Sequence, residues 1–176
     1  MIETLISSKT RIKLLLKFFL NSSTTAYLRG LEDEFGESTN SIRLELNRFE
    51  KAGFLESYSQ SNKKIFKVNE KHPLFKDINS IVLKLVGLDH VIDYVLQRMG
   101  NLKKVYLVGN LSKGKDSDVI DLVLVGDINE VFLKELIAKA EKKIHKSIHY
   151  VHCKEEDFHL KQITDADINP LLLWSK

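Results

Sequence analysis

The sequence predicts an α+β protein with two small domains joined by a helix. Three observations lead to this prediction. Residues 24–69 change from helical apolar spacing to strand-like alternation, and residues 74–99 form one long amphipathic segment. From residue 101 onward, short apolar runs alternate with a helical segment, the order typical of an α/β layer. We therefore expect a first domain over 1–72, a linker and dimerisation helix over 73–100, and a small α/β domain over 101–176.

The first domain is predicted to contain two consecutive helices before its strands. Thr24–Thr25 can cap a helix that ends at Gly36, where a left-handed residue costs least. Ser38 or Thr39 can cap the next helix. Three residues of this helix fall at i, i+4 and i+7 and should share one buried face, namely Ile42, Leu46 and Phe49.

A basic hairpin follows this pair of helices. Phe54–Tyr58 and Lys64–Val68 alternate enough to form two strands, with Ser59–Lys63 at the tip. The order predicts a winged helix-turn-helix that binds double-stranded DNA through the second helix and the wing. The alternative is a plain helical hairpin with a ribbon used for packing or dimerisation. The expected DNA-binding residues are Ser38, Thr39, Asn40, Ser41, Arg43, Leu44, Asn47, Lys51, Asn62, Lys63 and Lys64.

Several runs in the first 75 residues resemble the ArsR/MarR-type winged-helix regulators. They are Ser8–Leu15, Tyr27–Leu28, Ser38–Arg43, Leu46–Gly53 and Asn69–Phe75. More narrowly, these runs resemble bacterial winged-helix proteins that carry a nucleotidyltransferase-like domain behind the wing. The resemblance implies a DNA-binding transcriptional regulator.

The segment that follows, residues 74–99, has more apolar residues than one packing stripe needs. Such a helix must bury two faces, so we expect it to bridge the domains and to form a homodimer seam, with Gly87 kinking or dividing it. Helix-turn-helix dimers contact two half-sites about one helical turn apart, which would give the extra apolar surface a function.

In the last domain we expect three buried strands and one helix. The strands are Val105–Val108, Ile120–Val125 and Ile148–His152, and the helix is Val131–Ile144. The stretch Gly109–Leu122 between the first two strands resembles the nucleotidyltransferase loop of the DNA polymerase beta-like superfamily. In that family a Gly-Ser pair holds a triphosphate and a later Asp-x-Asp holds two magnesium ions.

The sequence departs from this family pattern at its metal-binding positions. Asn110 stands where the family has Ser, and Asp118 and Asp121 are three residues apart instead of two. If Asp121 takes the second metal position, Val119 takes the first and cannot bind a cation. The third carboxylate has no match on the later strand, where His149 is the nearest polar residue. We therefore expect no catalytic residues and a catalytically impaired nucleotidyltransferase fold.

A fold that has lost its metal site could still bind a nucleotide or another small phosphorylated ligand. Magnesium would accompany the nucleotide only if this domain retains binding; otherwise no cofactor is expected. The alternative is a retained scaffold used for dimerisation or partner contact, because the same loop also fits an ordinary exposed turn. The candidate residues are Gly109, Asn110, Ser112, Lys113, Gly114, Asp118 and Asp121.

Composition bears on the partners, metal content and location expected for this protein. Residues 1–72 hold 12 Lys/Arg against 9 Asp/Glu and residues 73–176 hold 15 of each, so the net charge of +3 lies in the first domain. Cys153 is the single cysteine, which excludes an intrachain disulfide. Four histidines, at positions 145, 149, 152 and 159, suggest zinc, but solvated histidine is the default and we expect no metal. No leader or membrane-spanning run is recognisable, so we expect a cytoplasmic protein with no membrane contact.

Two functions follow from these observations. The first is a sequence-specific DNA-binding transcriptional regulator, whose C-terminal domain dimerises or senses a ligand. The alternative is a nucleotidyltransferase that modifies a partner and is positioned by the winged helix. The spacing of Asp118 and Asp121 favours the first.

Overall fold

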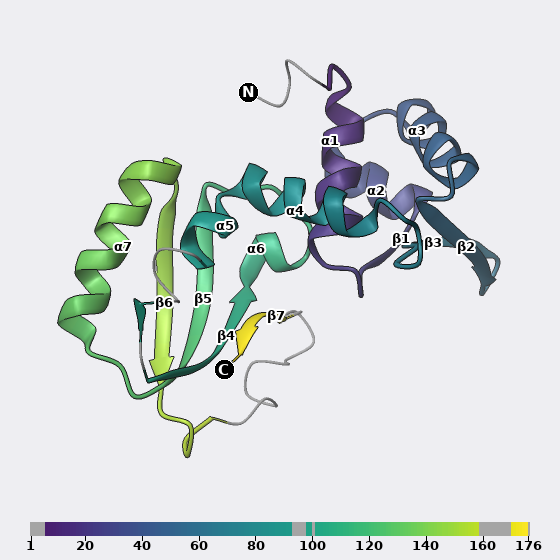
Figure 1. Cartoon of the computed structure of the whole chain (residues 1–176). Helices are drawn as coiled ribbons and strands as arrows, with labels where there is room; N and C mark the ends of the chain where they lie inside the picture. Colours follow the sequence, from purple (N-terminus) through teal and green to yellow (C-terminus); the bar gives the residue numbers. More distant parts are fainter. Residues whose placement is uncertain (1–5, 93–97, 100, 159–169, 176) are drawn as a thin grey trace. The chain divides into compact units, whose positions relative to one another are not determined.

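The computed structural model describes residues 6–92, 98–99, 101–158 and 170–175. The chain divides into two compact units, Met1–Val82 and Leu83–Lys176, and its elements are labelled in Figure 1. Both units mix helices and strands, so the predicted α+β class is confirmed. The division falls inside α4 (Phe75–Val86), within the segment predicted as a linker.

Three helical stretches form most of the N-terminal unit. α1 (Lys9–Leu15) is capped by the Ser8 hydroxyl, which accepts the Arg11 N–H, and continues as the π-helical turn η2 (Leu16–Leu20). α2 (Leu28–Phe35) ends at Gly36 in the left-handed conformation, as predicted. α3 (Thr39–Lys51) is capped by Ser38, which accepts the Ser41 N–H at 3.3 Å. The core between them contains Leu14, Phe18, Phe19, Leu31, Ile42 and Leu46.

A three-stranded antiparallel sheet completes this unit. Its strands are β1 (Thr25–Tyr27), β2 (Leu55–Gln60) and β3 (Lys63–Val68), in the order β1-β3-β2. The helix predicted from Thr24–Thr25 is wrong at its start, because Thr25–Tyr27 pair with β3 and the helix begins at Leu28. A pairing partner far along the chain has overridden the local capping signal.

The hairpin tip is shorter than predicted. β2 and β3 pair from Leu55↔Val68 to Gln60↔Lys63, which leaves Ser61 and Asn62 as a two-residue turn. Both have positive φ, 46° and 62°, the backbone that a tight hairpin of this length requires.

The long amphipathic segment is divided, as the sequence allowed. α4 is followed by Gly87 with φ 81° and then by α5 (Leu88–His90). An added Cβ on Gly87 would lie 3.0 Å from the Ile144 side chain, so both conformation and space favour glycine here. The predicted end of this helix at Gly100 lies outside the described residues, and the homodimer seam stays a prediction.

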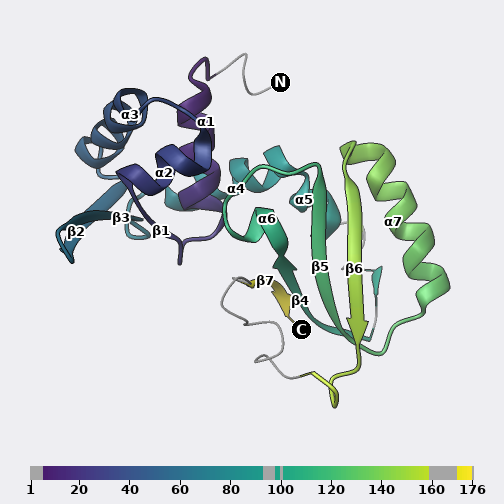
Figure 2. The same cartoon turned by 180° about the vertical axis from the view of Figure 1, so that it is seen from behind.

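The C-terminal unit is a four-stranded sheet in the order β6-β5-β4-β7. β4 pairs antiparallel with β5 and with β7, and β5 pairs parallel with β6. The helix α7 connects β5 to β6 and runs beside β6 in both views (Figures 1 and 2). The predicted strands and helix are confirmed within a few residues. The bounds are β4 (Leu102–Val108), α6 (Gly109–Ser112), β5 (Val119–Gly126), α7 (Glu130–Ile144), β6 (Ser147–Cys153) and β7 (Leu171–Ser175).

Strand alternation separates the two faces of this sheet. Val105 pairs with Leu124 on one face, and both are buried. Tyr106 pairs with Val123 on the other face, where Tyr106 also stacks on Phe158 with ring centroids 5.4 Å apart. Two residues along, Val108 pairs with Asp121, so the Asp121 carboxylate belongs to the Tyr106 face.

The apolar residues Leu171–Trp174 belong to the sheet of the C-terminal unit. They lie in β7, which pairs with β4 from Leu107↔Leu171 to Lys104↔Ser175.

Candidate functional site

The turn between β4 and β5 carries the residues predicted to bind a nucleotide. Gly109 leaves β4 with φ 71° and opens the short helix α6. Ser112 is fully buried and its hydroxyl donates to the Gly109 carbonyl at 2.9 Å. The N–H groups of Lys113, Gly114 and Lys115 bond to carbonyls of Asn110 and Leu111. Ser112 and Gly114 therefore hold the turn together, while Asn110 and Lys115 face solvent.

Gly109 lies directly against the Asp121 carboxylate. An added Cβ on Gly109 would overlap this carboxylate and would lie 3.0 Å from its Cγ. The Asp121 side chain would have to move to admit this Cβ, and the positive φ independently disfavours a side chain at position 109. Glycine thus lets the backbone of the turn approach a carboxylate that is itself only half-buried.

Asp121 has one neighbour of suitable chemistry on the adjacent strand. His149 is its partner in the parallel ladder, and His149 Nδ1 lies 3.5 Å from Asp121 Oδ1. Val119 occupies the position two residues earlier on the same face. Asp118 lies just before β5, where its backbone carbonyl accepts the Ser147 N–H at 2.9 Å.

These residues do not fit the two magnesium ions of the family pattern. Two ions need several carboxylates that converge, and Asp121 shares its face with Val119 and a histidine. Within the part of the chain that the structure describes, no three His, Cys, Asp or Glu side chains are arranged to hold a metal ion. We therefore derive no chemical step through metal ions.

Sequence reasoning missed a lysine that reaches this loop from elsewhere. Lys146, which follows α7, donates to the Ser117 carbonyl and lies 3.5 Å from the Asp116 carboxylate. It places a positive charge beside the same loop as Lys113 and Lys115. Its position depends on the α7–β6 connection, which no local spacing in the loop reveals.

The residues predicted to bind DNA lie in several places in the N-terminal unit. Arg43 and Asn47 of α3 line one hollow together with the hairpin residues Asn62, Lys63 and Lys64. A shallower hollow beside it is lined by Asn40, Ser41, Arg43, Leu44 and Asn47. Leu44 is 53% exposed, in keeping with its predicted outward position.

The remaining predicted DNA-binding residues, Ser38, Thr39 and Lys51, contribute to neither hollow. Ser38 caps α3, and its hydroxyl lies 3.0 Å from that of Ser41. Thr39 is the first residue of α3, and Lys51 is an exposed residue at its end.

An ion pair with a buried carboxylate links α3 to α1. The Glu45 carboxylate is 5% exposed and accepts Arg11 Nε at 2.8 Å and Arg48 at 2.7 Å. Burial alone would raise the pKa of Glu45, but the hydrogen bonds and charges of the two arginines outweigh burial and hold that pKa below its ordinary value. Lys13 similarly pairs with Glu37 at 2.8 Å. These basic residues of α1 thus have structural partners.

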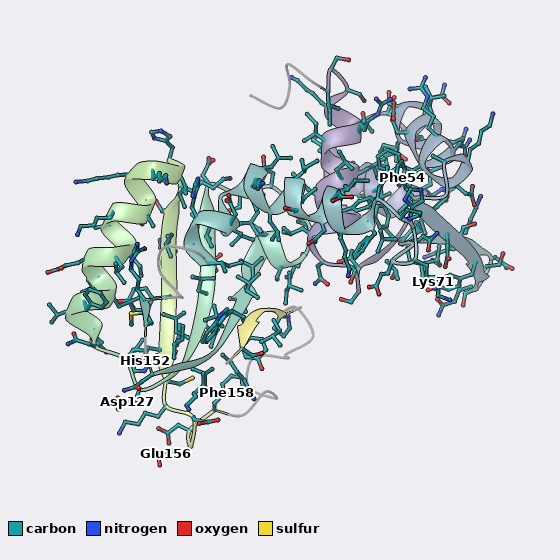
Figure 3. The ribbon with its side chains drawn as sticks, viewed as in Figure 1. Phe54, Lys71, Asp127, His152, Glu156 and Phe158 are labelled. Carbon is teal, nitrogen blue, oxygen red and sulfur yellow. The ribbon has the colours of Figure 1, made fainter. Side chains whose placement is uncertain are left out.

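A hollow of the C-terminal unit lies at the opposite end of the sheet from Asp121. Gly126 ends β5 there, and the His152 ring lies 2.8 Å from its carbonyl. Asp127, His152 and Glu156 are labelled at this end in Figure 3. The lining mixes both signs of charge, with Lys103 and Lys154 beside Asp127, Glu155 and Glu156. No sequence motif marks this hollow, because its lining comes from three separate segments of the chain.

Comparisons with known proteins were made for the whole chain. No protein-family model and no curated protein matches it. Among solved structures, a variant of the toxin–antitoxin MntA–HpeT matches with TM-score 0.39 and 17% identity, covering 51% of this chain and 72% of that chain. A candidate nucleotidyltransferase from Sulfolobus solfataricus matches with TM-score 0.37 and 20% identity, covering 56% and 86%.

These matches correct the main functional prediction. They are a toxin–antitoxin protein and a candidate nucleotidyltransferase, whereas the main prediction was a DNA-binding transcriptional regulator. The nucleotidyltransferase-like part of the resemblance is supported, and the regulator part is not. Both likenesses are low in TM-score and identity, so the function proposed below rests on this chain's own residues.

No helix in the described part of the chain is long and apolar enough to cross a membrane.

Proposed function

We propose that this chain works as a nucleotidyltransferase-type protein that binds a nucleoside triphosphate at the β4–β5 turn. The single observation that carries the proposal is the contact between Gly109 and Asp121. The backbone of this turn, with Gly109 in the left-handed region, lies directly against a half-exposed carboxylate at the position where the family pattern places a nucleotide. Lys113, Lys115 and Lys146 supply positive charge around the same turn.

The N-terminal unit has a separate role in this proposal. We infer that it is a winged helix-turn-helix, because α2, α3 and the β2–β3 hairpin follow in that order and α3 is exposed on one face. In the proposed function this unit holds the macromolecular partner on which the nucleotide-binding unit acts.

A second candidate function is nucleotide binding without transfer, and Val119 favours it. Because Val119 occupies the face position where the family pattern has a carboxylate, Asp121 would act alone. The two candidates share the nucleotide site and differ in whether a nucleotidyl group is passed to a partner.

Titration with a fluorescent ATP analogue tests the shared site. Asp121→Asn is compared with Asp127→Asn, which removes an exposed carboxylate at the opposite end of the same strand. We expect Asp121→Asn to change the Kd several-fold and Asp127→Asn to leave it unchanged. Absence of binding, or equal effects of the two variants, would overturn the proposal.

The direction of the change separates the two candidates. If the chain transfers a nucleotidyl group, Asp121→Asn should weaken nucleotide binding and should abolish the labelling of a partner in cell extract by labelled nucleotide. If the chain only binds the nucleotide, no partner is labelled, and Asp121→Asn should tighten binding because it removes a negative charge beside the phosphates.

A further inference from the structure

The N-terminal unit contains a hollow whose lining is strongly biased in charge. It lies between the start of α2, the exposed face of α3 and the two-residue turn of the β2–β3 hairpin, and we call it the cationic pocket. Its cations are Arg29, Arg43, Lys63 and Lys64, and none of its lining residues is acidic. Its volume is about 650 Å³, within the range of small-molecule sites, roughly 300–1,000 Å³.

The floor of the cationic pocket is apolar. Leu46 and Phe66 line it and are 1% and 4% exposed, so each presents only a small part of a core side chain. Asn47 and Asn62 add amide groups at its sides. An apolar floor with a few converging polar groups is the usual composition of a ligand site.

The two lysines of this pocket are held in place by their neighbours. Lys63 Nζ lies 4.1 Å from the centroid of the Tyr27 ring, and Tyr27 in turn packs against Gly30, where an added Cβ would lie 3.1 Å from the ring. Lys64 Nζ lies 5.0 Å from the Phe66 ring centroid and 2.7 Å from Glu50. Arg43 and Asn47 are one helical turn apart on α3 and therefore point to the same side.

We propose that the cationic pocket binds a small organic anion that carries an aromatic body. Charge complementarity selects the anion, because three arginine and lysine side chains besides the paired Lys64 surround a space without carboxylates. The apolar floor selects the aromatic body. This proposal is independent of the nucleotide site at the β4–β5 turn.

The test uses the fluorescent aromatic sulfonate 8-anilinonaphthalene-1-sulfonate and its uncharged analogue N-phenyl-1-naphthylamine on the full chain. Arg43→Gln removes a pocket cation, and Lys51→Gln removes an exposed cation of the same helix outside the pocket. We expect the sulfonate to bind more tightly than the neutral analogue. Arg43→Gln should weaken its binding about tenfold, as expected for one charge-assisted hydrogen bond, and Lys51→Gln should not.

Three controls complete the test. Thermal melting confirms that Arg43→Gln remains folded, Asp121→Asn should leave sulfonate binding unchanged, and 1-naphthoate should displace the sulfonate. The proposal is overturned if the neutral analogue binds equally well or if both cation variants have the same effect. Displacement by duplex DNA but not by 1-naphthoate would also overturn it, because the surface would then serve a nucleic acid.

Discussion

At the scale of single residues, the contact between Gly109 and Asp121 is the feature on which the proposed site depends. Gly109→Ala forces a left-handed alanine and displaces the Asp121 carboxylate, so we expect it to destabilise the C-terminal unit by about 2–4 kcal/mol. Urea unfolding followed by the fluorescence of Trp174, the single tryptophan of the chain, measures this loss.

The double variant Gly109→Ala, Asp121→Ala provides the control for this prediction. It removes the carboxylate that an alanine at position 109 would meet. The loss in free energy of unfolding should therefore fall to that of a left-handed alanine alone, about 1–2 kcal/mol. Equal destabilisation in the single and double variants would show that the close approach to Asp121 is not what requires glycine.

Glu45 determines a pH dependence of the N-terminal unit. Its pKa in the folded chain lies below the ordinary value of 4.5 despite the opposing effect of burial, because Arg11 and Arg48 bind the ionised form. The stabilisation is therefore complete above about pH 4.5 and is lost as the pH falls through the lower, folded value.

Replacing Glu45 with glutamine should remove this pH dependence. Glu45→Gln leaves two arginines without their carboxylate, and we expect it to destabilise the unit by about 1–3 kcal/mol at neutral pH and by less near pH 3. Thermal melting by circular dichroism across this range provides the measurement, with the exposed Glu70→Gln as control. A difference from wild type that is constant with pH would contradict the assignment.

At the scale of elements, β7 protects the edge of the sheet that carries the proposed site. Without it, β4 would present unpaired backbone groups to solvent. We expect deletion of residues 171–176 to speed amide exchange in β4 by at least about tenfold while β6, at the other edge, keeps its protection. Equal protection of β4 before and after deletion would mean that β7 does not stabilise this edge.

Elements with strong local signals were the ones that the sequence could predict. Gly36 and Ser38 mark the ends of α2 and α3 by backbone and capping chemistry that is local, and the hairpin alternates clearly. β1 was taken for the start of a helix because its strand character comes from pairing with β3, which is distant in the chain. The pairing of β7 with β4 was not predicted for the same reason.

In the candidate site, too, residues in a local pattern could be predicted and residues brought together by packing could not. Gly109 and Asp121 could be identified from the loop pattern, and the structure places them in contact. Lys146 could not, because it reaches the loop only after α7 has returned the chain to the sheet. The pocket formed by Arg29, Arg43 and the hairpin turn likewise joins residues whose proximity depends on packing.

At the scale of the whole molecule, the two units differ in charge and in the chemistry of their hollows. The N-terminal unit carries the excess of positive charge and the cationic pocket, while the C-terminal unit carries the turn proposed to bind a nucleotide. The predicted transcriptional regulator rested on the helices and hairpin of the N-terminal unit and on the altered spacing of Asp118 and Asp121, and neither pattern identifies an activity. A motif indicates a fold more securely than it indicates an activity.

The most direct test of the central proposal is a titration of the isotope-labelled full chain with ATP and magnesium, followed by amide chemical shifts in NMR spectra. We expect the largest shifts at residues 109–115 and around Asp121 and His149, and almost no shift at residues 127–130 at the opposite end of the sheet. Shifts confined to the opposite end of the sheet or to the N-terminal unit, or no shifts at all, would contradict the proposal.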